Sequence, residues 1–343
     1  MPTTLLELER LGEPASAEAP SPIRIPEEWT TGVELSPVPG IAYLMRCGRS
    51  VPESRTAIRF GTETLTYGTL FQVLARPDRV PVGTPVDRLI RLLGGLLGDA
   101  AGRGVLAGPH RYAPRIPVAA LAVAVADRRS VAAERKTVCT DRALGTADVR
   151  LYAAAWSDVG VAVELLSALA DGAALVIADE HERSVPGALV ELIERHGVTH
   201  VTGTLETVAG IAAAATALPT VCRWDITGTA PAPDLPGRLR ELAPRSLATF
   251  AFTSAGYAGA VTRGCFDGTG RTRPIPGARV QVLDPDLRPA APGVIGEVYV
   301  GGAAVGTPGT SAAFVPDPLE PGGRLFRTGE RGTWTSEGRL VFA

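Results

Sequence analysis

The chain has 343 residues, of which 45% are hydrophobic and 20% are charged, and its formal net charge is −2. This length and balance predict a large buried core divided over two or three compact units, so no disulfide framework is required. The net charge near zero offers no general attraction to nucleic acid or to an anionic membrane surface, and we expect neither as a partner.

Cysteine and histidine, which bind metals or form disulfides, are few in this chain, with four of each. The four cysteines are isolated from one another, and His196 and His200 are separated by Gly197 in what is expected to be a helix end followed by a strand. This pattern predicts neither a zinc site nor a secreted disulfide scaffold. No segment approaches about 18 consecutive apolar residues and no signal-like start is present, so a cytoplasmic protein is expected.

Residues 1–40 are rich in proline, which removes backbone donors and disfavours both helix and sheet. This N-terminal arm is predicted to be either a loose linker or a docking arm. The docking alternative depends on apolar anchors in the arm: Ile25, Trp29, Val33 and Leu35.

Residues 41–150 are expected to form a divergent and shortened first α/β subdomain. Residues 56–60 and 64–66 alternate as two strands of a hairpin. The apolar spacing of residues 86–101 predicts an amphipathic helix, and residues 117–135 are expected to form another.

Residues 151–272 show a strand–helix–strand rhythm that predicts a second α/β subdomain with a doubly wound parallel sheet. Gly172 and Gly197 are placed to end two of its helices. The expected elements are a helix over 161–171, a buried strand over 174–178, a helix over 185–196 and a strand over 198–202.

The residue pattern changes in 273–343, where short apolar runs are separated by clusters of glycine and proline. This pattern predicts a β-rich end unit, either a small barrel or a twisted sheet. The expected strands cover 279–283, 296–300, 324–326 and 339–342.

Several motifs follow one another in an order found in a known family. Gly296 to Gly302 reads G-E-V-Y-V-G-G, Phe314 to Pro318 reads F-V-P-D-P, and Leu325 to Glu330 reads L-F-R-T-G-E. Arg273 to Gly277 reads R-P-I-P-G, and Pro52 to Leu70 is similar to the family's opening segment. The chain resembles the adenylation domains of nonribosomal peptide synthetases, which share the adenylate-forming superfamily with acyl-CoA synthetases and luciferases.

The resemblance implies the large N-terminal core of the adenylate-forming fold, with two packed α/β sheets and a small β-barrel-like unit. The family continues into a mobile C-terminal subdomain with a catalytic lysine. Here the sequence given ends at Ala343 and its only lysine is Lys136, so that subdomain is expected to be absent.

The family's phosphate-binding loop, T-S-G-T-T-G-x-P-K-G, has no counterpart in this sequence. Its place is taken by His110 to Pro117, a short segment without glycine. Glycines let backbone N–H groups approach a phosphate closely, so this segment is not expected to cradle ATP. Arg111 and Arg115 are the two residues there with the charge to meet a phosphate.

The family's Y-G-P-T-E motif provides a glutamate for Mg²⁺, and the corresponding stretch here is Phe250 to Tyr257. Depending on the register, the glutamate position falls on Ala255 or on Gly256. A magnesium-dependent site without that carboxylate is not expected to work, so no cofactor and no metal are predicted.

The family selects its amino acid with an aspartate in F-D-x-S, a segment similar to the region that follows Trp156 here. An ungapped alignment from Gly172 puts Val159 at that position, one residue after Asp158. Asp158 is then a surface acid, a shifted ligand or a helix N-terminal residue favoured by the helix dipole, and we favour the last.

The ribose-binding aspartate of the family corresponds to Glu330, which is either a remnant ribose ligand or a surface turn residue. The resemblance also predicts a remnant of the substrate cleft. Its expected residues are Trp156, Asp158, Gly228, Phe252 and Tyr257.

The departures favour a non-catalytic pseudo-adenylation protein that binds a partner in a natural-product assembly line. The partner would be a carrier protein, an MbtH-like protein, a condensation domain, a tailoring enzyme or a second copy of the chain. One alternative is an enzyme with altered chemistry, with candidates among Asp158, Glu164, Tyr257, Cys265 and Glu330, although no nucleophile–base pair stands out. The other alternative is a small-molecule binder that uses the remnant cleft.

Overall fold

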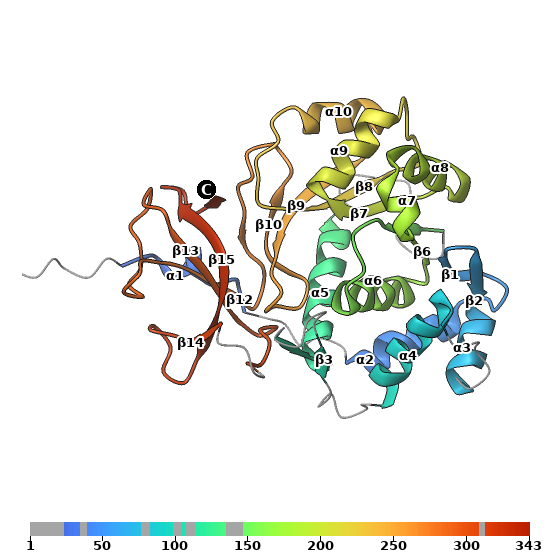
Figure 1. The fold of residues 1–343 in the computed structure, drawn as a ribbon, viewed down its shortest axis with the longest axis horizontal. Helices are drawn as coiled ribbons and strands as arrows, with labels where there is room; N and C mark the ends of the chain where they lie inside the picture. The colour runs from blue at the N-terminus through green and yellow to red at the C-terminus, as the bar shows by residue number, and fades with distance from the viewer. Residues whose placement is uncertain are drawn as a thin grey trace, which may run out of the picture.

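The computed structural model describes residues 24–34, 40–76, 83–98, 105–107, 114–134, 147–308 and 313–343. These residues form two lobes, one built around a nine-stranded sheet and the other around a five-stranded sheet (Figure 1). The expected mixed α/β fold with two main sheets is confirmed.

The centre of the nine-stranded sheet is parallel, as the strand–helix–strand rhythm predicted. Its spatial order is β1–β6–β5–β7–β8–β9, and antiparallel strands extend it at both edges. All four residues of β6 are buried, because helices cover both faces of the sheet. The strands are β1 (Thr56–Phe60), β2 (Glu63–Thr66), β5 (Val149–Tyr152), β6 (Ala174–Ile177), β7 (His200–Thr204), β8 (Arg223–Thr227), β9 (Leu247–Thr253), β10 (Ala260–Cys265) and β11 (Arg273–Pro274).

Helices pack on both faces of this sheet and divide the core into two clusters (Figure 1). One face carries α2 (Ile41–Cys47), α4 (Pro85–Gly98), α5 (Val118–Glu134) and α6 (Asp158–Asp171). The opposite face carries α8 (Pro186–His196), α9 (Leu205–Ala214) and α10 (Leu235–Leu242). The remaining short helices are η1 (Gly48–Ser50), α3 (Tyr67–Ala75) and α7 (Glu180–Ser184).

Helix α6 illustrates how local sequence sets an element. The side chain of Ser157 caps its start by accepting a hydrogen bond from the backbone of Gly160, 3.4 Å away. Gly172 ends the helix in the left-handed region, with φ of 71°. In α8, Pro186 is the first helical residue and Gly197 ends the helix in the left-handed region. The predicted C-terminal ends of both helices are confirmed, and α6 begins at Asp158, three residues before the predicted start.

The five-stranded sheet forms the β-rich lobe, and all four strands predicted for this region are confirmed. Its order is β12–β13–β15–β14, with β16 paired to β15. Arg273 and Pro274 pair with β10 instead, so the lobe begins at Ala278. The strands are β12 (Ala278–Leu283), β13 (Gly296–Gly302), β14 (Phe314–Pro316), β15 (Arg324–Trp334) and β16 (Leu340–Phe342).

The two α/β subdomains expected for 41–150 and 151–272 share one sheet. Ile58 of β1 is paired with Leu175 of β6, so the N-terminal hairpin extends the sheet of the second segment. Strands β3 (Val105–Ala107) and β4 (Arg115–Pro117) pair with each other in a small separate sheet. The boundaries near 150 and 272 stay predictions about folding units.

The described part of the N-terminal arm docks on its own chain. Trp29, in α1 (Glu27–Thr30), packs against Gly338, where an added Cβ would meet the indole at 2.5 Å. The backbone N–H of Gly32 donates to the carbonyl of Ala278 at 2.8 Å. Ile25 and Trp29 therefore pack against the chain's own core, whereas Val33 is 73% exposed. Residues 1–23 and 35–39, including Leu35, lie outside the described residues.

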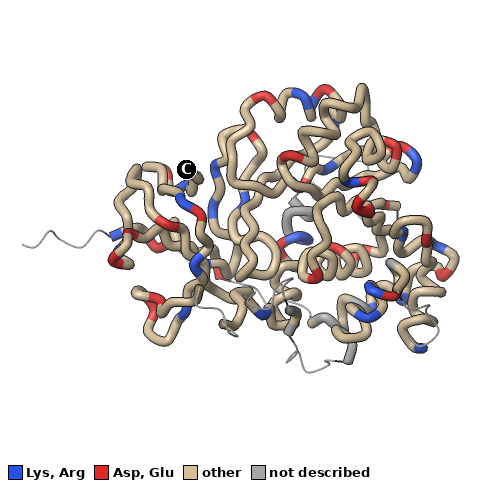
Figure 2. Tube along the Cα trace, in the orientation of Figure 1, with Lys and Arg blue, Asp and Glu red and all other residues tan. Residues whose placement is uncertain are grey.

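Charged residues of both signs are interspersed over the two lobes, in agreement with the net charge of −2 (Figure 2). Among the described helices, none is long and apolar enough to cross a membrane.

Candidate functional site

A cavity of about 410 Å³ opens where the parallel strands β5, β7, β8 and β9 end. The chain runs from β5 to β6 on one side and then returns to β7 on the other, so the strand order reverses at this place. Such switch points leave a crevice at the carboxyl ends of the strands, and ligands of open α/β sheets bind there. The described lining residues are Pro114, Ile116, Arg128, Tyr152, Ala154, Ala155, Ser157, Val159, Gly160, Val163, Thr202, Thr204, Asp225, Ile226, Thr227, Ala251, Thr253, Ser254, Ala255, Tyr257, Gly259, Ala260 and Arg263.

One wall of the cavity is the first turns of α6, which present Val159, Gly160 and Val163. Gly160 is required by close packing, because an added Cβ would lie 2.5 Å from the hydroxyl of Tyr152. That hydroxyl donates to the carbonyl of Ala155 at 3.1 Å, and burial raises the pKa of Tyr152 to about 12. The phenol is therefore a neutral, fixed part of the wall.

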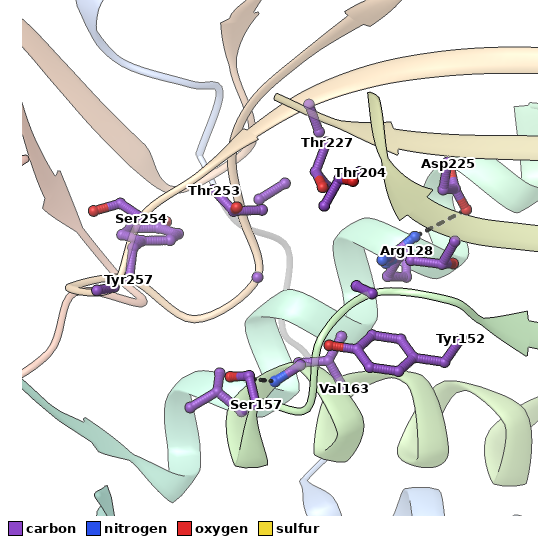
Figure 3. A pocket seen from close by; sticks show the side chains of 18 of the residues that line it. Arg128, Tyr152, Ser157, Val163, Thr204, Asp225, Thr227, Thr253, Ser254 and Tyr257 are labelled. Carbon is purple, nitrogen blue, oxygen red and sulfur yellow. Dashed lines mark hydrogen bonds and ion pairs between the residues drawn. The ribbon is translucent and has the colours of Figure 1, made fainter. Parts of the chain in front are cut away.

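The guanidinium of Arg128 is buried at the bottom of the cavity. Arg128 reaches from α5 toward Asp225 on β8, with Thr204 and Thr227 near one side and Ser157 and Val163 across from them (Figure 3). Its Nη1 lies 2.9 Å from Asp225 Oδ2, and its Nη2 lies 2.5 Å from Glu164 Oε1. Burial alone would lower the pKa of Arg128, but the neighbouring carboxylates raise it, so the side chain stays charged.

Asp225 is the centre of the floor. Its Oδ1 accepts hydrogen bonds from Arg223 Nη2 at 2.7 Å and from Thr249 Oγ1 at 2.7 Å, and Arg263 Nη1 lies 3.7 Å away. Burial by itself would raise the pKa of Asp225, but the guanidinium groups of Arg223, Arg128 and Arg263 hold it well below its ordinary value. The carboxylate is therefore ionised at any ordinary pH.

Further ion pairs extend this set away from the cavity. Arg263 Nη2 donates to Asp127 Oδ2 at 2.6 Å, and Arg150 Nη2 donates to Asp171 Oδ2 at 2.5 Å. Arg150 also approaches Glu164 at 4.0 Å, and Arg129 pairs with Asp171 at 3.0 Å. Arg129 is 39% exposed, and the other eight side chains are at most 13% exposed. We call these eight the buried ion network: Asp127, Arg128, Arg150, Glu164, Asp171, Arg223, Asp225 and Arg263.

At the other end of the cavity lies Tyr257, which is buried (Figure 3). Burial raises the pKa of Tyr257, so its hydroxyl is a neutral donor and acceptor. A hydrogen bond from the backbone of Ala304 partly offsets this rise in the pKa of Tyr257. Nε of Arg263 has no hydrogen-bond partner in the described residues, and this atom is covered by protein.

The residues expected for a substrate cleft are only partly gathered here. Tyr257 lines the cavity, whereas Trp156 and Asp158 are not among its lining residues although Ser157 and Val159 are. Asp158 accepts from Trp156 Nε1 at 2.6 Å and from Arg88 at 3.3 Å. It lies in the first turn of α6, which confirms the preferred helix N-terminal placement.

Three other predicted residues lie away from the lining. Gly228 follows β8, and its N–H donates to the carbonyl of Ala251 at 3.1 Å. Phe252 packs against Phe342, with ring centroids 4.5 Å apart, and fills space between the lobes instead of the cavity. Glu330 is exposed on β15. Their assignment to a remnant substrate or ribose site stays a prediction.

The residues named for altered chemistry are scattered. Glu164 is committed to the buried ion network, and Cys265 is exposed at the end of β10. No group of three or more His, Cys, Asp or Glu side chains in the described part of the chain is placed to hold a metal ion. His200 is buried with its Nδ1 2.7 Å from Thr199 Oγ1, a structural contact.

Sequence reasoning missed Arg128, Asp225 and Arg263. Two signals were present. Arg128 follows an Ala/Val-rich run that would otherwise be an apolar helix, and Asp225 interrupts the buried strand R-W-D-I-T. A charged residue inside an apolar element is rarely buried unless it is paired, so each of them indicated a partner elsewhere in the chain.

The region that corresponds to the family's metal carboxylate is closed by packing. A Cβ added to Gly256 would lie 2.2 Å from the ring of Phe326. Ala255 lines the cavity, but it carries no oxygen ligand. The described residues here do not fit a magnesium–ATP group, and Arg111 and Lys136 lie outside the described residues.

The segment that stands where the family has its phosphate loop is partly described. Pro114 and Ile116 line the cavity, and the backbone of Arg115 pairs with Thr307. These residues form strand β4 and its entry, so this stretch packs as a wall. A regular strand presents alternate N–H groups to its neighbours and provides no cradle for a phosphate.

The comparisons with known proteins agree with this fold. The family model for AMP-binding enzymes matches residues 122–307, more than half of the chain, and the chain belongs to this family. A chondramide synthase of Chondromyces crocatus is 33% identical over 211 residues, which is 53% of this chain and 5% of that protein. Bacitracin synthase 3 of Bacillus licheniformis is 28% identical over 201 residues, which is 53% of this chain and 3% of that protein.

Solved structures show the same core. The nonribosomal peptide synthetase FmoA3 in an AMPPNP-bound form superposes with a TM-score of 0.71 at 18% identity, over 91% of this chain and 43% of that chain. VinN superposes with a TM-score of 0.64 at 15% identity, over 90% of this chain and 100% of that chain. The protein is thus an adenylation-like domain related to components of peptide assembly lines, and it spans only a small part of the curated relatives' length.

Proposed function

We propose that this protein does not form acyl-adenylates and that it acts as a non-catalytic, partner-binding component of a nonribosomal peptide or related natural-product assembly line. The observation that carries the proposal is the packing of Phe326 on Gly256. A glutamate there would have to displace a buried aromatic ring, and Ala255 beside it has no carboxylate. Without a metal ligand at this place, phosphoryl transfer loses its main source of charge stabilisation.

Relatives in biosynthesis support the assembly-line context. The matched proteins are named as synthases of chondramide and bacitracin, and each alignment covers 53% of this chain. A domain that keeps its fold while its metal position is filled by packing is suited to binding, because the surfaces of a fold survive independently of its chemistry.

ATP–pyrophosphate exchange tests the absence of adenylation. Purified protein is incubated with radiolabelled pyrophosphate, ATP, Mg²⁺ and a panel of amino acids and carboxylic acids. We expect exchange at the background of a heat-denatured sample, with a competent adenylating member of the family as positive control. Exchange above background that is lost in Glu330→Gln would overturn the proposal.

The surface for a partner is expected on the β-rich lobe. Phe342 is only 8% exposed and Trp29 packs on its own chain, so neither offers a free apolar surface. Val294 and Ile295 are adjacent and are 53% and 48% exposed. Large apolar side chains exposed side by side are typical of contact surfaces.

Partner binding is tested by co-purification with the carrier, MbtH-like and condensation proteins of the same assembly line, together with light scattering of the protein alone. We expect the double variant Val294→Ser, Ile295→Ser to lose the complex. The control is Val185→Ser, which alters an exposed valine on the other lobe. If the protein is a strict monomer and none of these proteins co-purifies with it, the partner role is wrong. If the double variant keeps the complex as the control does, the surface at Val294 and Ile295 is wrong.

A second candidate function is the binding of a small ligand, and the retained cavity favours it. Its volume of about 410 Å³ lies within the range of ligand pockets, which runs from about 300 to 1,000 Å³. A protein that no longer binds a substrate is under no pressure to keep such a space open, and apolar side chains commonly close it.

A further inference from the structure

The N-terminal arm lies in a groove on the β-rich lobe, beside the edge strand β12 (Figure 1). Residues 31–33 run antiparallel to this strand. The backbone N–H of Gly32 donates to the carbonyl of Ala278 at 2.8 Å, and the N–H of Gly277 donates to the carbonyl of Val33 at 3.0 Å. The arm thus adds a short strand to the five-stranded sheet, which is how many proteins bind extended peptides.

The first half of this edge depends on the arm for its backbone partners. Along the later half, the chain's own turn covers the strand, and the N–H of Ala290 donates to the carbonyl of Val282 at 2.9 Å. If the arm left, Gly277 and Ala278 would lose the backbone partners that it provides. Backbone groups without partners on an edge strand are a template for another extended segment.

Two positions of the groove select side chains. Trp29 packs against Gly338, in the turn between β15 and β16, and a Cβ added to Gly338 would lie 2.5 Å from the indole. A Cβ added to Gly32 would lie 1.7 Å from the carbonyl oxygen of Ile275, which is a backbone atom. The groove therefore fits a large aromatic ring at one position and, three residues later, only glycine.

The docked part of the arm is held by few contacts of its own. Helix α1 has four residues, and its N-cap Pro26 makes no side-chain capping hydrogen bond. So short a helix is not stable without packing. Glu27 and Glu28 are exposed, and Val33 is 73% exposed. Segments with few buried contacts open at a small fraction of the free energy of global unfolding, so the groove becomes accessible while the rest of the chain stays folded.

We propose that this groove is a docking site for an extended segment of a partner protein, in which a large aromatic residue is followed three positions later by glycine. The arm occupies the site in cis and is itself the model of the ligand, because Trp29 and Gly32 are the side chains that the groove fits. The backbone bonds hold an extended segment, and the two selected positions decide which segment binds. This inference rests on the proposed partner-binding role and assigns it a second surface.

Fluorescence anisotropy of a labelled synthetic peptide with the sequence of residues 24–34 tests the site on the full chain. A tethered segment competes at an effective concentration of about 1 mM, so we expect weak binding to the parent chain. In the double variant Trp29→Ala, Gly32→Ala the arm loses both selected contacts, and the peptide should bind at least about tenfold more tightly than to the parent. The control Glu28→Ala, Val33→Ala changes exposed residues of the arm and should bind as weakly as the parent.

Variants of the peptide test the pattern without any change in the protein. Trp29→Ala in the peptide should weaken its binding to the double variant by at least about tenfold, because a tryptophan anchor typically carries much of the binding energy. Gly32→Ala should have a similar effect, because its methyl group meets a backbone carbonyl. Val33→Ala should leave the binding unchanged, because this side chain points to solvent.

A matched pair of glycines tests the groove. Gly338→Ala, added to the double variant, should abolish peptide binding, because the methyl group fills the place of the indole. Gly329→Ala is the control: φ is 69° at Gly338 and 81° at Gly329, so both substitutions strain the backbone, but nothing lies within 4 Å of a Cβ at Gly329. The peptide variants keep the test valid if Gly338→Ala lowers the melting temperature of the lobe.

The inference is wrong if the double variant binds the peptide no more tightly than the parent, if the Trp29→Ala and Gly32→Ala peptides bind as well as the original, or if Gly338→Ala and Gly329→Ala have equal effects. An assembly-line protein that uses the groove should co-purify better with the double variant than with the parent, and free peptide should displace it. Equal recovery with both chains overturns the docking of a partner here.

The outcomes also separate this inference from the proposed function. If the peptide does not bind but an assembly-line protein co-purifies and is lost in Val294→Ser, Ile295→Ser, the groove is wrong and the partner role stands. If the peptide binds with the expected pattern but none of these proteins co-purifies with either chain, the groove recognises peptides as inferred and the proposed assembly-line role fails.

Discussion

The two lobes manage their charged residues in opposite ways. Under the cavity, Arg223, Asp225 and Glu164 are almost completely removed from water and paired with one another. On the β-rich lobe, Arg327 pairs with Glu297 and Arg279 pairs with Asp317 and Glu320. Of these side chains only that of Asp317 is buried, and the others are at least 21% exposed.

Among the described residues, the α/β lobe buries several ion pairs side by side, whereas the β-rich lobe buries one carboxylate of the pairs named above. Taking charges out of water is expensive, and well-packed apolar residues of similar size are often at least as stabilising as a buried ion pair. Three members of the network, Arg128, Asp225 and Arg263, line the cavity.

The largest effect is expected from Asp225→Asn. The amide leaves Arg128, Arg223 and Arg263 without their shared counter-charge, and breaking a buried pair in this way typically costs about 3–5 kcal/mol of folding free energy. Urea denaturation followed by circular dichroism measures the change. A loss below about 1 kcal/mol, the level of an exposed pair, would show that the network is not buried in solution.

Gly256→Ala tests the contact between the lobes. The new methyl group would overlap the ring of Phe326, so we expect a loss of about 1–3 kcal/mol, which is typical of overpacking. Gly237→Ala in α10 is the matched control, because nothing lies within 4 Å of its Cβ and alanine favours a helix by about 0.5–1 kcal/mol. Thermal melting compares the two, and equal melting temperatures would contradict the packing.

Acid should weaken the network in a defined range. The folded-state pKa of Asp225 is depressed below the unfolded value of about 4, so its contribution to stability is fully present above about pH 5 and is lost as pH falls further. The difference in unfolding free energy between the parent and Asp225→Asn should therefore be constant above pH 5 and shrink below pH 4, by at most about 1.4 kcal/mol per pH unit. A difference that stays constant to pH 3 would contradict this account.

The smallest effect is expected on the β-rich lobe. Glu297→Gln removes the partner of Arg327, whose hydrogen bond lowers the pKa of Glu297. Because Arg327 is largely exposed, water replaces the lost contact, and we expect little change in melting temperature. A loss comparable with that of Asp225→Asn would remove the distinction between the lobes.

Local patterns predicted most of the secondary structure. The ends of α6 and α8 were readable because Gly172 and Gly197 adopt the left-handed conformation that glycine tolerates. The strands of the β-rich lobe were readable from their spacing between glycine and proline clusters. The pairing of the hairpin over residues 56–66 with β6 could not be predicted from the sequence, because the pairing of distant strands leaves no local pattern.

For the site, the order of residues showed that the phosphate loop is missing, placed Ala255 or Gly256 at the metal position, and aligned Val159 with the family's aspartate. The side chains that occupy this region could be found only from the packing of distant segments. Arg128, Asp225 and Arg263 come from α5, β8 and β10, and a side chain's partner across about a hundred residues is set by sheet order and helix packing, which no local pattern encodes.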